Sequence, residues 1–250
     1  MKLALLSDLH ANERALRACL AHARDAGAQQ FAVLGDLVGY GAEPAAVVDE
    51  VMALARQGAV VLRGNHDQAA VAPPAEVRNL EGAGAAWTHG QLSPAQRDWL
   101  AALPLTARLE SSLLVHASAH EPARWDYVDN PRSASLCLQA AEALQGVAQV
   151  FCGHVHEQRM YYRGRGRDPM AFDPVTAAPA RVPASRIWLA TVGSVGQPRD
   201  GDPRAMYALF DTAQSRLVFH RVPYDHPGAA EAVRRAGLPE SFARRLMEGR

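Results

Sequence analysis

Residues 147–156, VAQVFCGHVH, join an apolar run to two histidines that stand two positions apart. The run over residues 147–150 is typical of a buried β-strand. On extended backbone, residues i and i+2 point to the same side, so His154 and His156 would lie next to each other where the strand leaves the core. The pair could arise by chance, bind one metal ion, or belong to a larger set of ligands. The residues at the ends of the other predicted strands decide between these alternatives.

Strand and helix patterns alternate from the first residues onward. Apolar runs predict buried strands over residues 3–6, 31–34 and 60–62. The first intervening helix is predicted to start after the N-cap Asn12 and to stop at Gly27. The second starts at Pro44 and stops at Gly58. This β-α-β-α-β order predicts a parallel sheet that is covered by helices.

The later elements are less regular. Residues 73–104 are Ala-rich and predicted to be helical, with a capping box at residues 93–96, and a strand follows over 113–115. A helix is expected over residues 135–144. The Arg-, Gly- and Pro-rich segment 157–185 predicts a loop or an irregular hairpin. Strand-like runs over 187–192, 206–210 and 217–222 are predicted to pair as a meander, and the tail from Pro227 to form two short helices.

Composition narrows the class of protein. The chain has 250 residues, of which 48% are hydrophobic, enough for one large α/β domain. Its formal net charge of zero argues against general binding to nucleic acid or to an anionic membrane. Three cysteines, Cys19, Cys137 and Cys152, do not suggest a disulfide framework, and Cys152 is expected to be a small buried hydrophobe. With no predicted signal peptide or membrane span, we expect a cytoplasmic protein.

Polar side chains follow five of the predicted strands. They are Asp8 with His10, Asp36, Asn65 with His66, His116, and His154 with His156. Ligands bind at the carboxyl ends of strands in α/β sheets, so these clusters could converge on one patch. Asp, Asn and His supply the oxygen and imidazole ligands that divalent transition ions accept.

In this order, the motifs DLH, GDLVGYG, GNHD, VH and GHVH resemble those of the calcineurin-like metallophosphoesterases, and they span residues 8–156. The segment GSVGQPR at residues 193–199 is similar to an extension in the bacterial phosphodiesterase-like branch. The resemblance implies an α/β fold with four layers, α-β-β-α, in which two mixed sheets are flanked by helices. It also implies a single domain over residues 1–250, with helical insertions near 73–104 and 117–135.

The resemblance further implies two divalent transition-metal ions, with Mn, Fe, Zn and Ni all suited to the ligands. Asp8, His10 and His156 would hold one ion; Asn65, His116 and His154 would hold the other; Asp36 would bridge both. A metal-bridging hydroxide would attack phosphorus. His66 would donate a proton to the leaving oxygen, and Asp67 is a weaker catalytic candidate that could orient His66.

The implied activity is hydrolysis of a small phosphorylated or phosphodiester substrate. Phosphodiesters are expected ahead of phosphomonoesters. The stretch after Asp36 is Leu37-Val38-Gly39-Tyr40-Gly41, so it lacks the Asp-Arg-Gly that the protein Ser/Thr phosphatases carry after this motif, and the segment 193–199 is similar to the phosphodiesterase-like extension. A second hypothesis is an inactive scaffold or metal-binding interaction protein on the same fold. It is less favoured because His66 and all seven ligand positions are present.

Other polar and aromatic residues leave alternatives open. His120 and Arg199 are candidate substrate contacts. Arg163, Arg165 and Arg167 are expected to form a solvated loop, with steering of phosphate as the alternative. Trp125 and Tyr127 could stack a nucleobase, but aromatic residues in such a loop are more often expected to pack it down.

Overall fold

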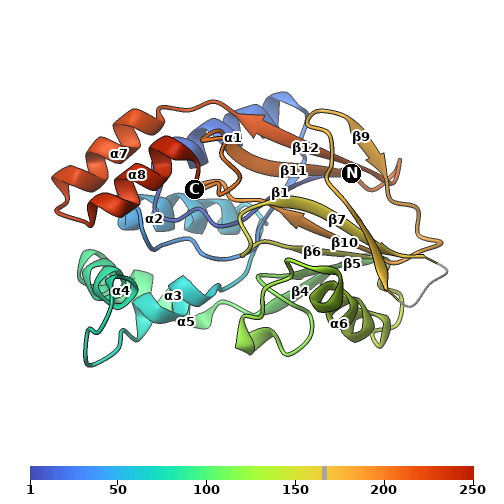
Figure 1. Cartoon of the computed structure of the whole chain (residues 1–250), viewed down its shortest axis with the longest axis horizontal. Helices are drawn as coiled ribbons and strands as arrows, with labels where there is room; N and C mark the ends of the chain where they lie inside the picture. Colours follow the sequence, from blue (N-terminus) through green and yellow to red (C-terminus); the bar gives the residue numbers. More distant parts are fainter. Residues whose placement is uncertain (165–167) are drawn as a thin grey trace.

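The computed structural model describes residues 1–164 and 168–250, and two six-stranded sheets face each other at its centre (Figure 1). The first sheet has the order β3-β2-β1-β11-β12-β9. Its strands are β1 (Lys2–Leu6), β2 (Gln30–Val33), β3 (Val60–Val61), β9 (Pro179–Arg181), β11 (Ala205–Asp211) and β12 (Arg216–Val222). The second sheet has the order β4-β5-β6-β10-β7-β8. Its strands are β4 (Thr106–Leu109), β5 (Ser112–Val115), β6 (Gln149–Cys152), β7 (Gln158–Arg163), β8 (Pro169–Phe172) and β10 (Trp188–Val192).

Side-chain alternation along the strands separates the layers. In β1, Leu3 and Leu5 pack between the sheets, in the same core as Phe151 of β6, while Ala4 and Leu6 pack in the core beneath the helices. This two-residue period is the geometry of extended backbone. Both sheets are mixed. In the first sheet, β1, β2 and β3 run parallel to one another, and β11 runs antiparallel to β1. In the second sheet, β10 runs parallel to β6 and antiparallel to β7.

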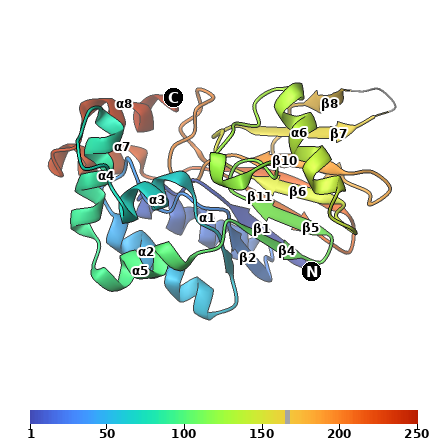
Figure 2. The same cartoon turned by 90° about the horizontal axis from the view of Figure 1, so that it is seen from below.

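Helices cover the two outer faces (Figure 2). α1 (Glu13–Asp25) and α2 (Pro44–Arg56) pack on the first sheet, and α6 (Pro131–Glu142) packs on the second. α1 begins as predicted, because the Asn12 side chain accepts a hydrogen bond from the Ala15 N–H (3.1 Å). The predicted four-layer α/β arrangement is confirmed. Cys152 is buried in the core beneath α6, and burial raises the pKa of its thiol.

The remaining helices gather at one end of the sheets, on the left of Figure 1. They are α3 (Asn65–Val71), α4 (Leu80–Gln91), α5 (Pro94–Ala102), α7 (His226–Arg235) and α8 (Glu240–Glu248). The predicted capping box is present at α5, where Ser93 and Gln96 exchange side-chain to backbone hydrogen bonds. The two predicted helices of the tail are α7 and α8. No helix in the described parts of the chain combines the length and the apolar character needed to cross a membrane.

The predicted meander is wrong in one strand. β11 and β12 pair, but β10 lies in the other sheet, between β6 and β7. The reason is the segment after β10, which crosses to the first motif, where the N–H groups of Val195 and Gly196 donate to the carbonyls of Ser7 and Asp8 (both 2.9 Å). These bonds direct the chain from one sheet to the other.

Two irregular segments differ in how far they match expectation. Within 157–185, β7 and β8 form a hairpin, as one of the two predicted alternatives has it, and β9 in addition extends the first sheet. The segment near 117–135 is not a helical insertion: it holds one 3-10 turn, η1 (Pro122–Arg124), before α6 begins. Asn130 accepts from the N–H groups of Arg132 and Ser133, so this N-cap starts α6 four residues earlier than predicted. Arg165 and Arg167 lie outside the described residues.

Candidate metal centre

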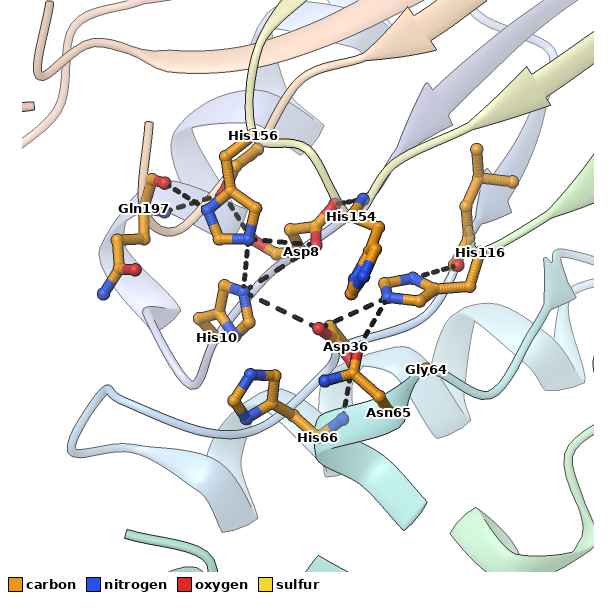
Figure 3. A network of polar contacts seen from close by, with 12 residues as sticks. Asp8, His10, Asp36, Gly64, Asn65, His66, His116, His154, His156 and Gln197 are labelled. Atoms are coloured by element: carbon orange, nitrogen blue, oxygen red, sulfur yellow. Dashed lines mark hydrogen bonds and ion pairs between the residues drawn. The ribbon is translucent and has the colours of Figure 1, made fainter. Parts of the chain in front are cut away.

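The seven predicted ligands lie together at the carboxyl ends of five strands (Figure 3). Loops after β1, β2, β5 and β6 carry Asp8, His10, Asp36, His116, His154 and His156, and the first residue of α3, shortly after β3, is Asn65. All of these side chains are buried except Asn65, which is half-buried. The centre therefore draws on both sheets, because β1, β2 and β3 belong to the first and β5 and β6 to the second.

One group of candidate ligands contains Asp8, His10 and His156. The Nε2 atoms of His156 and His10 lie 3.2 and 3.8 Å from Asp8 Oδ1. The two Nε2 atoms are 3.0 Å apart. Three donor atoms thus converge on a small buried volume.

A second group contains Asp36, His116 and His154. His116 Nε2 lies 3.3 Å from Asp36 Oδ2 and 3.2 Å from Asn65 Oδ1, which adds the amide to this group. Asp36 Oδ2 is also 3.9 Å from His10 Nε2 in the first group. The GHVH histidines are therefore divided between two groups, and Asp36 lies between them.

Each carboxylate is anchored through one oxygen only. Asp8 Oδ2 accepts from the His154 N–H (2.9 Å), and Asp36 Oδ1 accepts from the His66 N–H (2.8 Å). Their other oxygens are buried and accept no hydrogen bond within the described residues. Buried polar atoms are rarely left so, which marks these two oxygens as candidates for a ligand.

The imidazole tautomers are set by backbone carbonyls. Three Nδ1 atoms lie on such oxygens: His10 on Val38 (3.1 Å), His116 on Leu34 (2.9 Å) and His156 on Gln197 (2.6 Å). A carbonyl only accepts, so each Nδ1 carries the hydrogen. In the neutral rings, the Nε2 lone pairs then point into the centre, as in metal-ligating histidines.

These donors fit two divalent cations. Two imidazole lone pairs 3.0 Å apart repel each other unless a cation lies between them. Burial lowers the pKa of His116, but the Asp36 carboxylate outweighs this effect and raises it to about 9. The same negative potential would favour a divalent ion, and mixed oxygen and imidazole ligands suit Mn, Fe, Zn and Ni.

The backbone around the centre is strained. Asp8, Asp36, His154 and His156 have φ between +52° and +65°, which is rare for residues with a Cβ. Position 153 accepts no residue other than glycine, because a Cβ there would overlap Ser7 Oγ and Asp8 Oδ2. The close approach of loop to carboxylate requires glycine.

His66 lies at the start of α3, and its ring faces the first group. The ring centroid is 5.1 Å from that of His10 and 4.6 Å from that of Tyr40. His66 Nε2 is 3.8 Å from Glu81 Oε1 of α4, and its side chain is 10% exposed. Burial lowers the pKa of His66, while the carboxylates of Asp36 and Glu81 oppose that shift. The ring is thus near the centre without being enclosed by it.

Asp67 braces two loops by contacts with backbone. Its carboxylate accepts from the N–H groups of Leu37 (2.8 Å), Val38 (3.2 Å) and Gly64 (2.9 Å). Burial raises the pKa of Asp67 to about 7, against the amides of Gly64 and Val38. These hydrogen bonds do not involve the His66 ring. Asp67 therefore does not orient the ring directly, as predicted, and acts on it only through the backbone that it holds in place.

The predicted substrate contacts differ in position. Arg199 lies beside the first group, where Nη2 donates to Gln197 Oε1 (3.0 Å). His120 is half-buried in the turn after β5, where its N–H donates to Ser118 Oγ (3.1 Å). No interaction found in the described residues links the His120 ring to the centre. Arg163 forms an ion pair with Glu142 of α6 (3.2 Å).

The two aromatic residues of the segment 117–135 line the second group. Trp125 lies edge-on to His116, with centroids 5.8 Å apart. Tyr127 stacks on His154 at 4.1 Å and is 50% exposed. Trp125 has φ of +58°, so this loop is held in a strained conformation next to the centre.

Two neighbours of the centre are not identified by the sequence analysis. Tyr40 contacts the rings of His10 and His66, and its position between Gly39 and Gly41 within GDLVGYG is a signal for a constrained turn. Gln197 contributes its backbone carbonyl to His156, and a main-chain contact of this kind leaves no trace in residue type.

Comparisons with known proteins agree with this geometry. Residues 1–215 match the calcineurin-like phosphoesterase superfamily domain. The chain is similar to a metallophosphoesterase from Sphaerobacter thermophilus, with 34% identity, a TM-score of 0.87, and coverage of 100% of this chain and 99% of that one. A hypothetical protein from Pyrococcus horikoshii shares the fold, with 20% identity, a TM-score of 0.78, and coverage of 100% and 98%. An uncharacterized protein of Methanocaldococcus jannaschii is 29% identical, over 99% of this chain and 98% of its own length.

Proposed function

This chain belongs to the calcineurin-like phosphoesterase superfamily, and from that membership we propose that it is a binuclear metal-dependent phosphoric ester hydrolase. The observation that carries the proposal is the pair of buried ligand groups on either side of Asp36. Both groups combine unsatisfied carboxylate oxygen with imidazole lone pairs. The separation of the groups by one shared carboxylate supports two ions over one.

We assign one ion to Asp8, His10 and His156, the other to Asn65, His116 and His154, and the bridging role to Asp36. When bound, two such ions would supply a hydroxide nucleophile near neutral pH and neutralise charge on the phosphoryl group. His66 would donate a proton to the leaving oxygen, a role supported by its place at the rim and by the Glu81 carboxylate beside it. Asp67 would hold the start of α3, which carries Asn65 and His66, against the loop after β2.

For the substrate, we propose phosphodiesters first and phosphomonoesters second. The stretch after Asp36 is Leu37-Val38-Gly39-Tyr40-Gly41, so the arginine of the Asp-Arg-Gly that the protein Ser/Thr phosphatases carry is missing. Arg199 is the favoured substrate contact, because it lies next to the first group and its Nε is buried without a hydrogen-bond partner in the described residues. His120 is the weaker candidate of the two.

The test is hydrolysis of bis(p-nitrophenyl) phosphate and p-nitrophenyl phosphate by protein loaded with Mn²⁺, with and without chelator. We expect turnover of at least one ester that chelator abolishes and added Mn²⁺ restores. The ratio of the hydrolysis rates of the diester and the monoester shows which of the two substrate classes the protein prefers. If neither ester is hydrolysed in a metal-dependent manner, the enzyme assignment is refuted.

The same protein sample distinguishes the scaffold hypothesis. Metal analysis that finds two bound ions together with no turnover would favour an inactive metal-binding protein. The presence of His66 together with the ligand set favours the enzyme, because an inactive scaffold needs neither and an inactive metal-binding protein does not need His66.

A further inference from the structure

Tyr40 forms part of the wall of the candidate metal centre. Its ring centroid is 4.9 Å from that of His10 and 4.6 Å from that of His66. Its φ of +61° holds it in the left-handed region, and a Cβ on Gly41 would overlap the carbonyls of His10 and Ala11. The turn is therefore built to hold this ring against two site histidines.

Two guanidinium groups lie over the same ring, and they come from different parts of the chain. Arg199 Cζ is 5.8 Å and Arg245 Cζ is 5.9 Å from the Tyr40 centroid. Both side chains are half-buried. Neither has a carboxylate within 4.0 Å among the described residues. Arg199 Nε is buried, and no described residue accepts a hydrogen bond from it. Both guanidinium groups are therefore partly desolvated and have no carboxylate partner in the described residues, a state that a bound anion would stabilise.

Helix α8, which carries Arg245, is firmly attached to the centre. Phe242 of the same helix is buried and meets the Tyr40 ring edge-on at 5.1 Å. Beyond α8, the Gly249 carbonyl accepts from the Gly201 N–H (2.8 Å), which ties the helix to the loop that holds Arg199. Both arginines are thus positioned by packed structure.

We propose that Tyr40, Arg199 and Arg245 form an anion subsite that binds a phosphoryl group of the substrate beside the first ligand group. The inference rests on the proposed function, because it takes the bound anion to be part of a phosphoric ester. A guanidinium donates two parallel hydrogen bonds to phosphate oxygens, and the Tyr40 hydroxyl adds one more donor. The C-terminal α8 thereby becomes part of the active site.

The test measures binding of inorganic phosphate to the Mn²⁺-loaded protein by calorimetry. Arg245→Met keeps the length of the side chain and removes its charge. We expect Kd for phosphate to rise about tenfold or more, since a charge-assisted pair is lost. Arg199→Met should act in the same direction, and Arg245→Lys should be intermediate. The matched control is Arg244→Met, because Arg244 is the exposed neighbour on the same helix and should leave Kd unchanged.

Metal content and thermal unfolding of each variant show whether the centre and the fold are intact. Phosphate binding that is undetectable in the wild type, or equally tight in folded, metal-loaded Arg245→Met, would overturn the subsite. Binding that depends on Arg245 in a protein that hydrolyses no ester would support the subsite while refuting the proposed function. In an active enzyme, Arg245→Met should raise KM more than it lowers kcat.

Discussion

The backbone N–H of His154 donates a 2.9 Å hydrogen bond to Oδ2 of Asp8, across 146 positions of sequence. The bond turns Oδ1 of the same carboxylate toward His156 Nε2, 3.2 Å away. One loop therefore both orients the Asp8 carboxylate and supplies its imidazole partner. Gly153 makes this approach possible, because any side chain there would overlap Asp8.

Gly153→Ala is expected to damage both the fold and the first ligand group. The added methyl would displace Ser7 or Asp8, and such overpacking costs about 1–3 kcal/mol. Thermal unfolding should shift downward and metal analysis should find less bound ion. Gly90→Ala is the control, since a Cβ at this exposed helical position meets nothing within 4 Å. Equal unfolding temperatures for the Gly153 variant and wild type would contradict the packing argument.

Asp36→Asn and Asp8→Asn should differ in how much metal they lose. Asp36 Oδ2 lies near His116 in one group and His10 in the other, whereas the ion-pair contacts of Asp8 Oδ1 are within the first group. We expect Asp36→Asn to lose both ions and Asp8→Asn to lose one, measured by metal analysis after dialysis. Loss of the same number of ions from both variants would show that Asp36 does not bridge.

His66→Gln should retain both ions and lose turnover of esters with a basic leaving oxygen. A proton donor matters most when the leaving oxygen is basic, so the effect should depend on the ester. We expect kcat to fall about 10²–10⁴-fold for an alkyl ester and much less for a nitrophenyl ester. Kinetics with the two esters, alongside metal analysis, measure this difference. An equal loss for both esters would assign His66 a role other than proton donation.

His220 predicts a pH dependence of stability away from the centre. It stacks on Tyr207 at 4.7 Å, and burial together with His22 lowers its pKa from 6.5 to about 4. The unfolded state therefore binds the His220 proton more tightly than the folded state. Neutral His220 contributes to the free energy of unfolding above pH 6.5, and this contribution is lost as the pH falls toward 4. His220→Phe keeps an aromatic ring without the titration. Its unfolding temperature should fall less steeply than that of wild type over this pH range. An unchanged slope would exclude His220 as a source of this dependence.

The candidate ligand set is predictable from the sequence because metal binding would require particular residue types at strand ends. Asp8, Asp36 and the GHVH pair each follow an apolar run, and parallel strands bring their carboxyl ends to one edge. The expected division of His154 and His156 came from the family resemblance, and the structure separates them in the same way. The role of Asp67 differed, because its hydrogen bonds go to backbone groups whose positions no motif encodes.

Local pattern is sufficient for the elements of this protein: the two-residue alternation of β1, the Asn12 cap and the polar strand ends are all legible in order along the chain. Packing between distant segments is needed for the rest. It assigns β10 to the second sheet, sets three imidazole tautomers through backbone carbonyls, and brings Arg199 and Arg245 to one tyrosine. The physical reason is that hydrophobic periodicity shows which side of a helix or strand is buried. Strand pairing and contacts with backbone carbonyls instead depend on which segments, far apart in the sequence, the fold brings together.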